Sequence, residues 1–212
     1  MHLFCSYIAS LTRQDPEDFV REVEVDVKSY DEFCVYEFTI GRFAFKQVLW
    51  TEIEDSDWTK DDVLDSDSQE LIDIYDAMFG PDGDFIPELR LNEPTECIVV
   101  LDRVVLHPEI VECEQHLLNA ALELFTYASL VVAWRPLLKM SDRELAQIGF
   151  KKLAGSSLVF RHSCLKNEYQ SMFPRGFDDS VDATEDHEEW FLKEWGSWEA
   201  EKSDEDNAEN SN

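Results

Sequence analysis

The stretch CIVVLDRVVL, which spans residues 97–106, decides the fold. Eight of its ten positions are apolar, and such a run is typical of a central strand that is buried on both faces of a sheet. His107 and Pro108 follow, and proline has no N–H to donate to a neighbouring strand, so we expect the strand to end there. The stretch predicts an α/β fold with a mixed central β-sheet flanked by helices on both faces.

The residues after this strand alternate between helix and strand signals. We expect a helix over about 111–127, because its apolar positions recur at helical spacing, and a buried strand over 130–133. Ser141 and Glu144 have the spacing of a capping box and predict the start of a short helix. A closing hairpin around Gly155 follows.

The residues before the central strand have a different pattern. Residues 1–50 are expected to be mostly strands, because apolar and acidic side chains alternate at Val23, Glu24, Val25, Asp26 and Val27. Two stretches rich in β-formers, 33–40 and 43–53, are separated by Gly41, which indicates a hairpin with its break at that glycine.

The segment between these strands and the central strand is acidic. Residues 54–67 are predicted to be a loop. Ser66 and Gln69 have capping-box spacing, so a helix is expected to begin there. Gly80 is expected to end that helix as a left-handed cap.

The charge of the chain is strongly one-sided. Its 212 residues include 47 acidic and 18 basic side chains, which gives a net charge of −29. Residues 178–212 account for −12 of this and residues 1–177 for −17, so the body is acidic in its own right. Direct binding of nucleic acid is excluded because phosphate would be repelled, whereas a basic protein partner would be attracted.

The cysteines and the apolar runs indicate a cellular location. The cysteines are scattered and form no C-x-x-C pair: Cys5, Cys34, Cys97, Cys113 and Cys164. Free, buried thiols in a reducing cytoplasm are the expected interpretation. No apolar run reaches the length of a membrane span, so we expect a cytoplasmic protein without membrane contact.

Four segments are expected along the chain. They are a domain over 1–165, a polar linker over 166–187, a short aromatic amphipathic helix over 188–200 and a disordered acidic tail over 201–212. The aromatic helix has two interpretations. It either docks on its own domain or anchors the chain in a groove of a partner through Trp190, Phe191, Trp195 and Trp198.

Three stretches together resemble the GNAT acetyltransferase superfamily. LDRVVLHPE at 101–109 is similar to the fourth strand, which the main cofactor helix follows, and ASLVVAWRPLL at 128–138 is similar to the fifth strand. IGFKKLAGSSLVFR at 148–161 is similar to the closing hairpin, whose sixth strand begins at a Gly-Phe pair. Residues 68–89 also resemble a group of uncharacterised bacterial members. The resemblance covers about residues 66–161 and implies a GNAT-like fold.

The resemblance also implies a cofactor site. In that superfamily a loop with arginine or glutamine and glycines opens the main helix, whose free N–H groups hold the pyrophosphate of acetyl-CoA. The matching residues 110–116, IVECEQH, have no glycine and no arginine, and place Glu112 and Glu114 there. At ~5 Å and an effective dielectric near 20, each carboxylate–phosphate pair costs about 3 kcal/mol. The alternative role of the two glutamates is to complement the helix dipole.

Part of this site is independent of side chains. The superfamily pairs the backbone of its fourth strand with the pantetheine arm, and the degenerate loop also offers backbone groups. The matching positions are Val104, Val105, Leu106, Val111, Glu112, Cys113 and Glu114. The tyrosine that many members use as general acid has no counterpart in residues 143–147. We therefore expect no cofactor, or acetyl-CoA if the protein is active, and assign no catalytic residue.

Histidines and a cysteine near this loop have plainer interpretations. His107 and His116 flank the loop and are close enough in sequence to form a ligand pair, but a surface or N-cap role is the expected one, and we predict no metal. Cys113 lies at a helix start, where a thiolate is favoured, but two flanking carboxylates oppose it as a nucleophile.

Two further groups of charged residues each have a structural and a functional interpretation. Glu52, Glu54 and Asp55 follow a predicted strand, where a GNAT general base sometimes lies, and are otherwise a solvated acidic face. Asp102 and Arg103 lie within the buried strand, either as an internal ion pair or beside a substrate.

Three functional hypotheses follow. The first is a GNAT-like protein with a degraded acetyl-CoA site that binds a basic, nucleic-acid-binding protein through its acidic surface, as an inhibitor or nucleic-acid mimic does. The second is an active acetyl-CoA-dependent N-acyltransferase with an amine substrate. The third is an antitoxin or subunit that uses the aromatic helix.

Overall fold

The computed structural model describes residues 1–8, 15–80, 82, 84–89, 91, 95–125, 130–162 and 181–209. In this part of the chain one sheet is formed by β1 (His2–Ile8), β2 (Val20–Tyr30), β3 (Glu37–Val48), β4 (Ile98–Leu106), β5 (Leu130–Trp134), β6 (Lys151–Lys152) and β7 (Leu158–His162). The strand order is β1-β2-β3-β4-β5-β7-β6. Only β4 and β5 are parallel, so the sheet is mixed and the predicted α/β class is confirmed.

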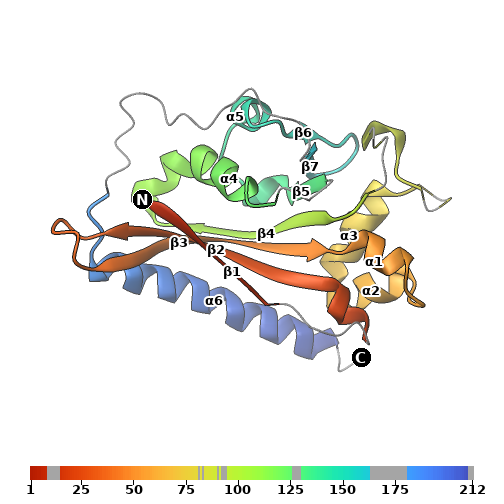
Figure 1. The fold of residues 1–212 in the computed structure, drawn as a ribbon, viewed down its shortest axis with the longest axis horizontal. Helices are drawn as coiled ribbons and strands as arrows, with labels where there is room; N and C mark the ends of the chain where they lie inside the picture. Colours follow the sequence, from red (N-terminus) through yellow and green to blue (C-terminus); the bar gives the residue numbers. More distant parts are fainter. Residues whose placement is uncertain are drawn as a thin grey trace.

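Helices cover both faces of this sheet. The α-helices are α1 (Trp50–Glu54), α2 (Lys60–Asp67), α3 (Gln69–Met78), α4 (Glu114–Leu122), α5 (Asp142–Gln147) and α6 (Glu185–Glu209). Short 3₁₀ turns are η1 (Pro16–Phe19), η2 (Pro87–Leu89), η3 (Pro108–Cys113) and η4 (Arg135–Leu137). Figure 1 shows α4 and α5 on one face, α6 along the opposite face, and α1, α2 and α3 gathered at one end.

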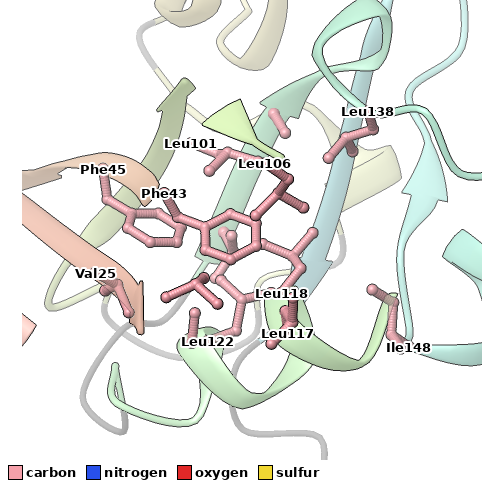
Figure 2. Close-up of a cluster of buried hydrophobic side chains, with 14 of the residues drawn as sticks. Val25, Phe43, Phe45, Leu101, Leu106, Leu117, Leu118, Leu122, Leu138 and Ile148 are labelled. Carbon is pink, nitrogen blue, oxygen red and sulfur yellow. The ribbon is translucent and has the colours of Figure 1, made fainter. Parts of the chain in front are cut away.

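The main core lies between the sheet and α4. Side chains of β2, β3 and β4 converge there on side chains of α4 and of the segment around α5 (Figure 2). The labelled contributors are Val25, Phe43, Phe45, Leu101, Leu106, Leu117, Leu118, Leu122, Leu138 and Ile148. Phe45 contacts Phe125 edge-to-face at a centroid distance of 4.8 Å, a geometry that aromatic pairs favour.

Two further clusters lie outside the main core. One packs α1, α2 and α3 together, with Trp50 stacked on Phe79 at 4.9 Å between centroids. The other joins α6 to the sheet. Because β4 contributes to all three clusters, burial on both of its faces accounts for its nearly continuous apolar sequence.

Several elements lie where the sequence predicted them. The strands expected at 97–106 and 130–133 are β4 and β5. The Ser141 hydroxyl accepts a hydrogen bond from the Glu144 N–H, and the Glu144 carboxylate accepts one from the Ser141 N–H, so this capping box is confirmed. The closing hairpin is β6 and β7. The helix expected over 111–127 instead begins as η3 and ends at Leu122 within α4.

The predicted break at Gly41 is wrong, because β3 runs through that position. A Cβ atom at Gly41 would lie 2.7 Å from Leu106 Cδ2 and 2.9 Å from the Val105 carbonyl oxygen. The glycine therefore allows β3 to approach β4 closely. The turn between β2 and β3 lies earlier, where Asp31 Oδ1 accepts hydrogen bonds from the N–H groups of Val35 and Tyr36.

The predicted end of the strand over 50–53 is wrong, because α1 lies there, and the loop predicted over 54–67 is correct only for residues 55–59, because α2 begins at Lys60. The capping box here belongs to Thr59, whose hydroxyl accepts from the Asp62 N–H at 3.1 Å while the Asp62 carboxylate accepts from the Thr59 N–H. Ser66 instead donates to the Val63 carbonyl inside α2, and α3 begins at Gln69.

Two other boundaries differ from the predictions. Among the described glycines the positive-φ positions are Gly149 and Gly155, so Gly80 is not a left-handed cap. Helix α6 extends beyond the predicted range of 188–200 at both ends, into the expected linker and tail. Residues 163–180, which hold most of that linker, lie outside the described residues. No helix in the described part of the chain is long and apolar enough to cross a bilayer.

Candidate functional site

The sequence-predicted cofactor residues lie at the end of β4, in the turn that follows it and at the first position of α4. β4 ends at Leu106, and the His107 side chain accepts a hydrogen bond from the Glu109 N–H as the cap of η3. Ile110 is fully buried beneath η3 and fixes the turn on the core. Cys113 is also buried, so its thiol does not reach solvent as a nucleophile would have to.

Glu114, the first residue of α4, is a buried acid with a partner. Its side chain is bonded to the N–H of Lys139, which approaches the two carboxylate oxygens at 3.1 and 3.3 Å. Burial raises the pKa of this carboxyl group, and the hydrogen bond from Lys139 opposes that rise. The carboxylate therefore fastens α4 to the segment between β5 and α5, a role that the helix-dipole interpretation did not include.

A pocket of about 170 Å³ lies at this point, between the start of α4 and the segment before α5. Three glutamates line it, namely Glu112, Glu114 and Glu144, together with Lys139. Its charged lining is therefore mainly negative. We call it the α4 pocket, and such a lining opposes a diphosphate.

The backbone of β4 is paired on one side along its whole length. Val104, Val105 and Leu106 are opposite the β3 residues Phe43, Arg42 and Gly41. On the other side, β4 pairs with β5 only from Ile98 to Leu101. From Val104 to Leu106 none of the described strands pairs with that edge, and this is where the resemblance places a pantetheine arm.

A larger pocket, of about 630 Å³, lies between α2 and α3. We call it the aspartate pocket after the exposed carboxylates in its lining: Asp61, Asp62, Asp65, Asp76 and Asp82. Leu64, Ile72 and Tyr75 add apolar surface, and no lysine or arginine is among the lining residues. Burial raises the pKa of Tyr75, and the charges of Asp61 and Asp76 raise it further, as expected in a negative field.

The aromatic side chains of α6 lie on the sheet of their own domain. Phe191 and Trp195 are buried at 1% and 5% exposure, and they pack against Ala44 and Val105. Neither ring is available to a partner while α6 is docked, which corrects the anchor hypothesis for these two residues.

Arginines of the sheet hold the same helix. The guanidinium of Arg42 lies 4.7 Å from the Trp195 ring centroid and forms ion pairs with Glu24 and Asp26 at 2.7 and 2.6 Å. The guanidinium of Arg103 lies 4.7 Å from the ring centroid of Trp198. Cation–π contacts of this kind add to the apolar packing of α6.

The other acidic residues that the sequence singled out take part in local structure rather than in a shared site. Glu52 and Glu54 lie in α1, and Glu54 is 3.1 Å from the Lys60 amino group. Asp55 caps the end of α1. The charge of Asp102 acts on buried Lys46; burial opposes the charge of that lysine, but Asp67 and Asp102 together raise its pKa.

The thiols divide into two groups. Cys97 and Cys113 are buried, as predicted, and burial raises the pKa of Cys97 to about 11. The expectation of burial is wrong for Cys5 and Cys34, which are exposed. Cys164 lies outside the described residues.

The N-cap role expected for His107 is confirmed, because this residue caps η3. The sequence left open a ligand pair of His107 with His116, and the ring that His107 meets in the structure is that of His187. His107 lies beside His187 of α6, with ring centroids 4.4 Å apart, and also contacts Trp190. Burial lowers the pKa of His107, and the neighbouring His187 lowers it further. His187 also meets Glu109, with Nε2 and Oε2 3.3 Å apart. The sequence offered no signal for these contacts of His187, because Glu109 lies 78 positions earlier in the chain.

No family model, curated protein or solved structure matches the chain.

Proposed function

We propose that this protein is a GNAT-like, non-catalytic binding protein that receives a basic protein partner in the aspartate pocket. The observation that carries the proposal is the lining of that pocket, where five exposed carboxylates surround an apolar surface without a basic side chain. A lysine or arginine of a partner can place its charged end among the aspartates and its aliphatic stem on Leu64, Ile72 and Tyr75.

The GNAT-like part of the proposal rests on the order of the elements. The stretches that resemble the fourth strand, the fifth strand and the closing hairpin form β4, β5 and the β6–β7 pair, with α4 directly after β4. The non-catalytic part rests on the α4 pocket, where Glu112, Glu114 and Glu144 would face the diphosphate of acetyl-CoA. Repulsion of this kind removes cofactor affinity.

The class of partner follows from charge. A net charge of −29 attracts a basic protein over a long range and raises its association rate. Proteins that bind nucleic acid have basic surfaces, so an acidic protein that covers such a surface acts as an inhibitor or nucleic-acid mimic.

A matched pair of charge variants tests this proposal. The pocket variant changes the five aspartates of the aspartate pocket to asparagine. The control variant changes five exposed acids near and on α6, at Asp182, Glu185, Asp186, Glu189 and Glu194, to the corresponding amides. Both variants lose the same net charge, so a difference between them reports position.

The probe is a fluorescent peptide rich in lysine and arginine, and the readout is anisotropy at low and high salt. Because each exposed ion pair contributes about 0.2–1 kcal/mol, we expect the pocket variant to bind the peptide about tenfold or more weakly than the wild type. The control variant should lose less, and salt should weaken wild-type binding steeply. Equal losses in the two variants would overturn the assignment of the pocket.

The edge of β4 from Val104 to Leu106, which none of the described strands pairs on the β5 side, favours a second candidate, an N-acyltransferase that binds acetyl-CoA by backbone pairing. In that case millimolar acetyl-CoA raises the melting temperature, because a ligand that binds only the folded state stabilises it. The first proposal predicts no shift.

A further inference from the structure

Three side chains with metal-binding atoms meet where α6 begins. His107 and Glu109 come from the turn after β4, and His187 comes from the first turn of α6. Their ligand atoms all lie within 4.8 Å of one another. The cluster thus joins two segments that are far apart in the sequence.

The spacing is close to that of a metal site. In a tetrahedral zinc site with bonds of about 2.0–2.1 Å, ligand atoms lie roughly 3.3 Å apart. His187 Nε2 already lies 3.3 Å from Glu109 Oε2. The side chain of Glu109 is 62% exposed, whereas that of His187 is only 12% exposed. The carboxylate can therefore rotate toward an ion while the imidazole stays in place.

A neighbouring hydroxyl orients the ring of His187. Its Nδ1 lies 2.7 Å from Thr184 Oγ1. In the structure Nδ1 also accepts a hydrogen bond from the Thr184 N–H at 3.1 Å, which leaves the ring proton on Nε2. An ion that binds Nε2 therefore moves that proton to Nδ1, where the Thr184 hydroxyl accepts it and the bond from the Thr184 N–H is lost. The Nδ1 lone pair of His107 accepts a hydrogen bond from the Glu109 N–H at a long 3.4 Å, and an ion that binds this nitrogen replaces that hydrogen bond.

The donor set selects a class of cation. Two imidazoles and one carboxylate suit zinc and similar transition-metal ions, whereas magnesium and calcium prefer oxygen ligands alone. We propose that His107, Glu109 and His187 bind one zinc-like ion that fastens α6 to the turn between β4 and α4. A fourth position remains for water.

Calorimetric titration with Zn²⁺ tests the site. Excess Mg²⁺ occupies carboxylate-only positions, and changing Cys5, Cys34 and Cys164 to serine removes the competing thiols. We expect one ion per chain, with an affinity about tenfold or more weaker after His107→Ala, His187→Ala or Glu109→Gln. His116→Ala, a histidine outside the cluster, serves as the control and should bind as the wild type does.

His187→Ala removes a side chain of α6, so a loss of zinc affinity in this variant can come from weaker docking of that helix alone. Melting temperatures measured with and without Zn²⁺ provide a second test that does not depend on this variant. The ion should raise the melting temperature of the wild type and of His116→Ala, but not of Glu109→Gln, whose exposed side chain carries little of the fold. Absence of zinc binding in the wild type, or equal affinity in all variants, would overturn the proposal.

Discussion

Glu114 at the start of α4 and the carboxylates of the aspartate pocket are both acidic sites, but their partners differ. Glu114 is buried and bonded to the Lys139 N–H. The five aspartates are exposed around a pocket whose lining includes no lysine or arginine. The comparison teaches that the negative charge of Glu114 is used for structure, whereas four of the five pocket charges remain available for a partner and the fifth, on Asp62, is bonded in the capping box of α2. Removing Glu114 should therefore lower stability, whereas removing the pocket acids that lie near helix C-termini, Asp65 and Asp76, should raise it.

The largest effect is expected at Glu114. Glu114→Ala leaves the Lys139 N–H without its charged acceptor, so unfolding should cost about 1–3 kcal/mol less than in the wild type. Denaturant unfolding measures this change. Glu114→Gln keeps an oxygen acceptor and should lose less, and Glu112→Ala removes an exposed acid in the same loop and serves as the control. Equal stability of Glu114→Ala and Glu112→Ala would contradict the structural role of Glu114.

A smaller effect of opposite sign is expected in the aspartate pocket. Asp65 and Asp76 lie in the last turns of α2 and α3, where a negative charge opposes the helix dipole. Asp65→Asn with Asp76→Asn should therefore raise stability by about 0.3–1 kcal/mol per site at low salt. Asp61→Asn is the matched control, because Asp61 lies in the first turn of α2 and its loss should lower stability slightly.

The same variants have an optical readout. Because the charge of Asp76 contributes to the raised pKa of Tyr75, Asp76→Asn should lower the pKa of that phenol toward its ordinary value. Ultraviolet titration of the tyrosines measures the change. A pKa of Tyr75 that does not move would show that Asp76 does not act on the pocket.

The smallest expected effect is a dependence on pH. Burial raises the pKa of Glu114 above 4.5, so the folded protein binds this proton more tightly than the unfolded chain does. The associated stability is present below the unfolded pKa and is lost as pH rises through the folded pKa. Glu114→Gln has no such proton, so its stability relative to the wild type should increase from about pH 4 to about pH 7. A constant difference would contradict the burial effect.

The sequence predicted elements whose signals are local and missed those set by tertiary contacts. β4 and the capping box at Ser141 depend on composition and spacing over a few residues, and both are present. Gly41 was misread because close approach to Leu106 cannot be seen in the pattern around it. Helix α2 was missed because its eight residues are mostly polar and bury mainly Val63 and Leu64.

The candidate sites show the same division. The negative charge at the start of α4 was predictable, because Glu112 and Glu114 lie close together in the segment that follows β4 in the sequence. The bond between Glu114 and Lys139 was not, because it links segments that only the fold brings together. The cluster of Glu109 with His187 depends in the same way on the docking of α6, which the sequence left open.

The docking of α6 has a practical consequence for the isolation of partners. A chain shortened at residue 180 would lose Phe191 and Trp195 and leave Ala44 and Val105 on a bare apolar face. Such a face associates with many proteins without specificity. Affinity purification with a shortened chain would thus enrich proteins that bind non-specifically, so the chain that includes α6 should be used to capture partners.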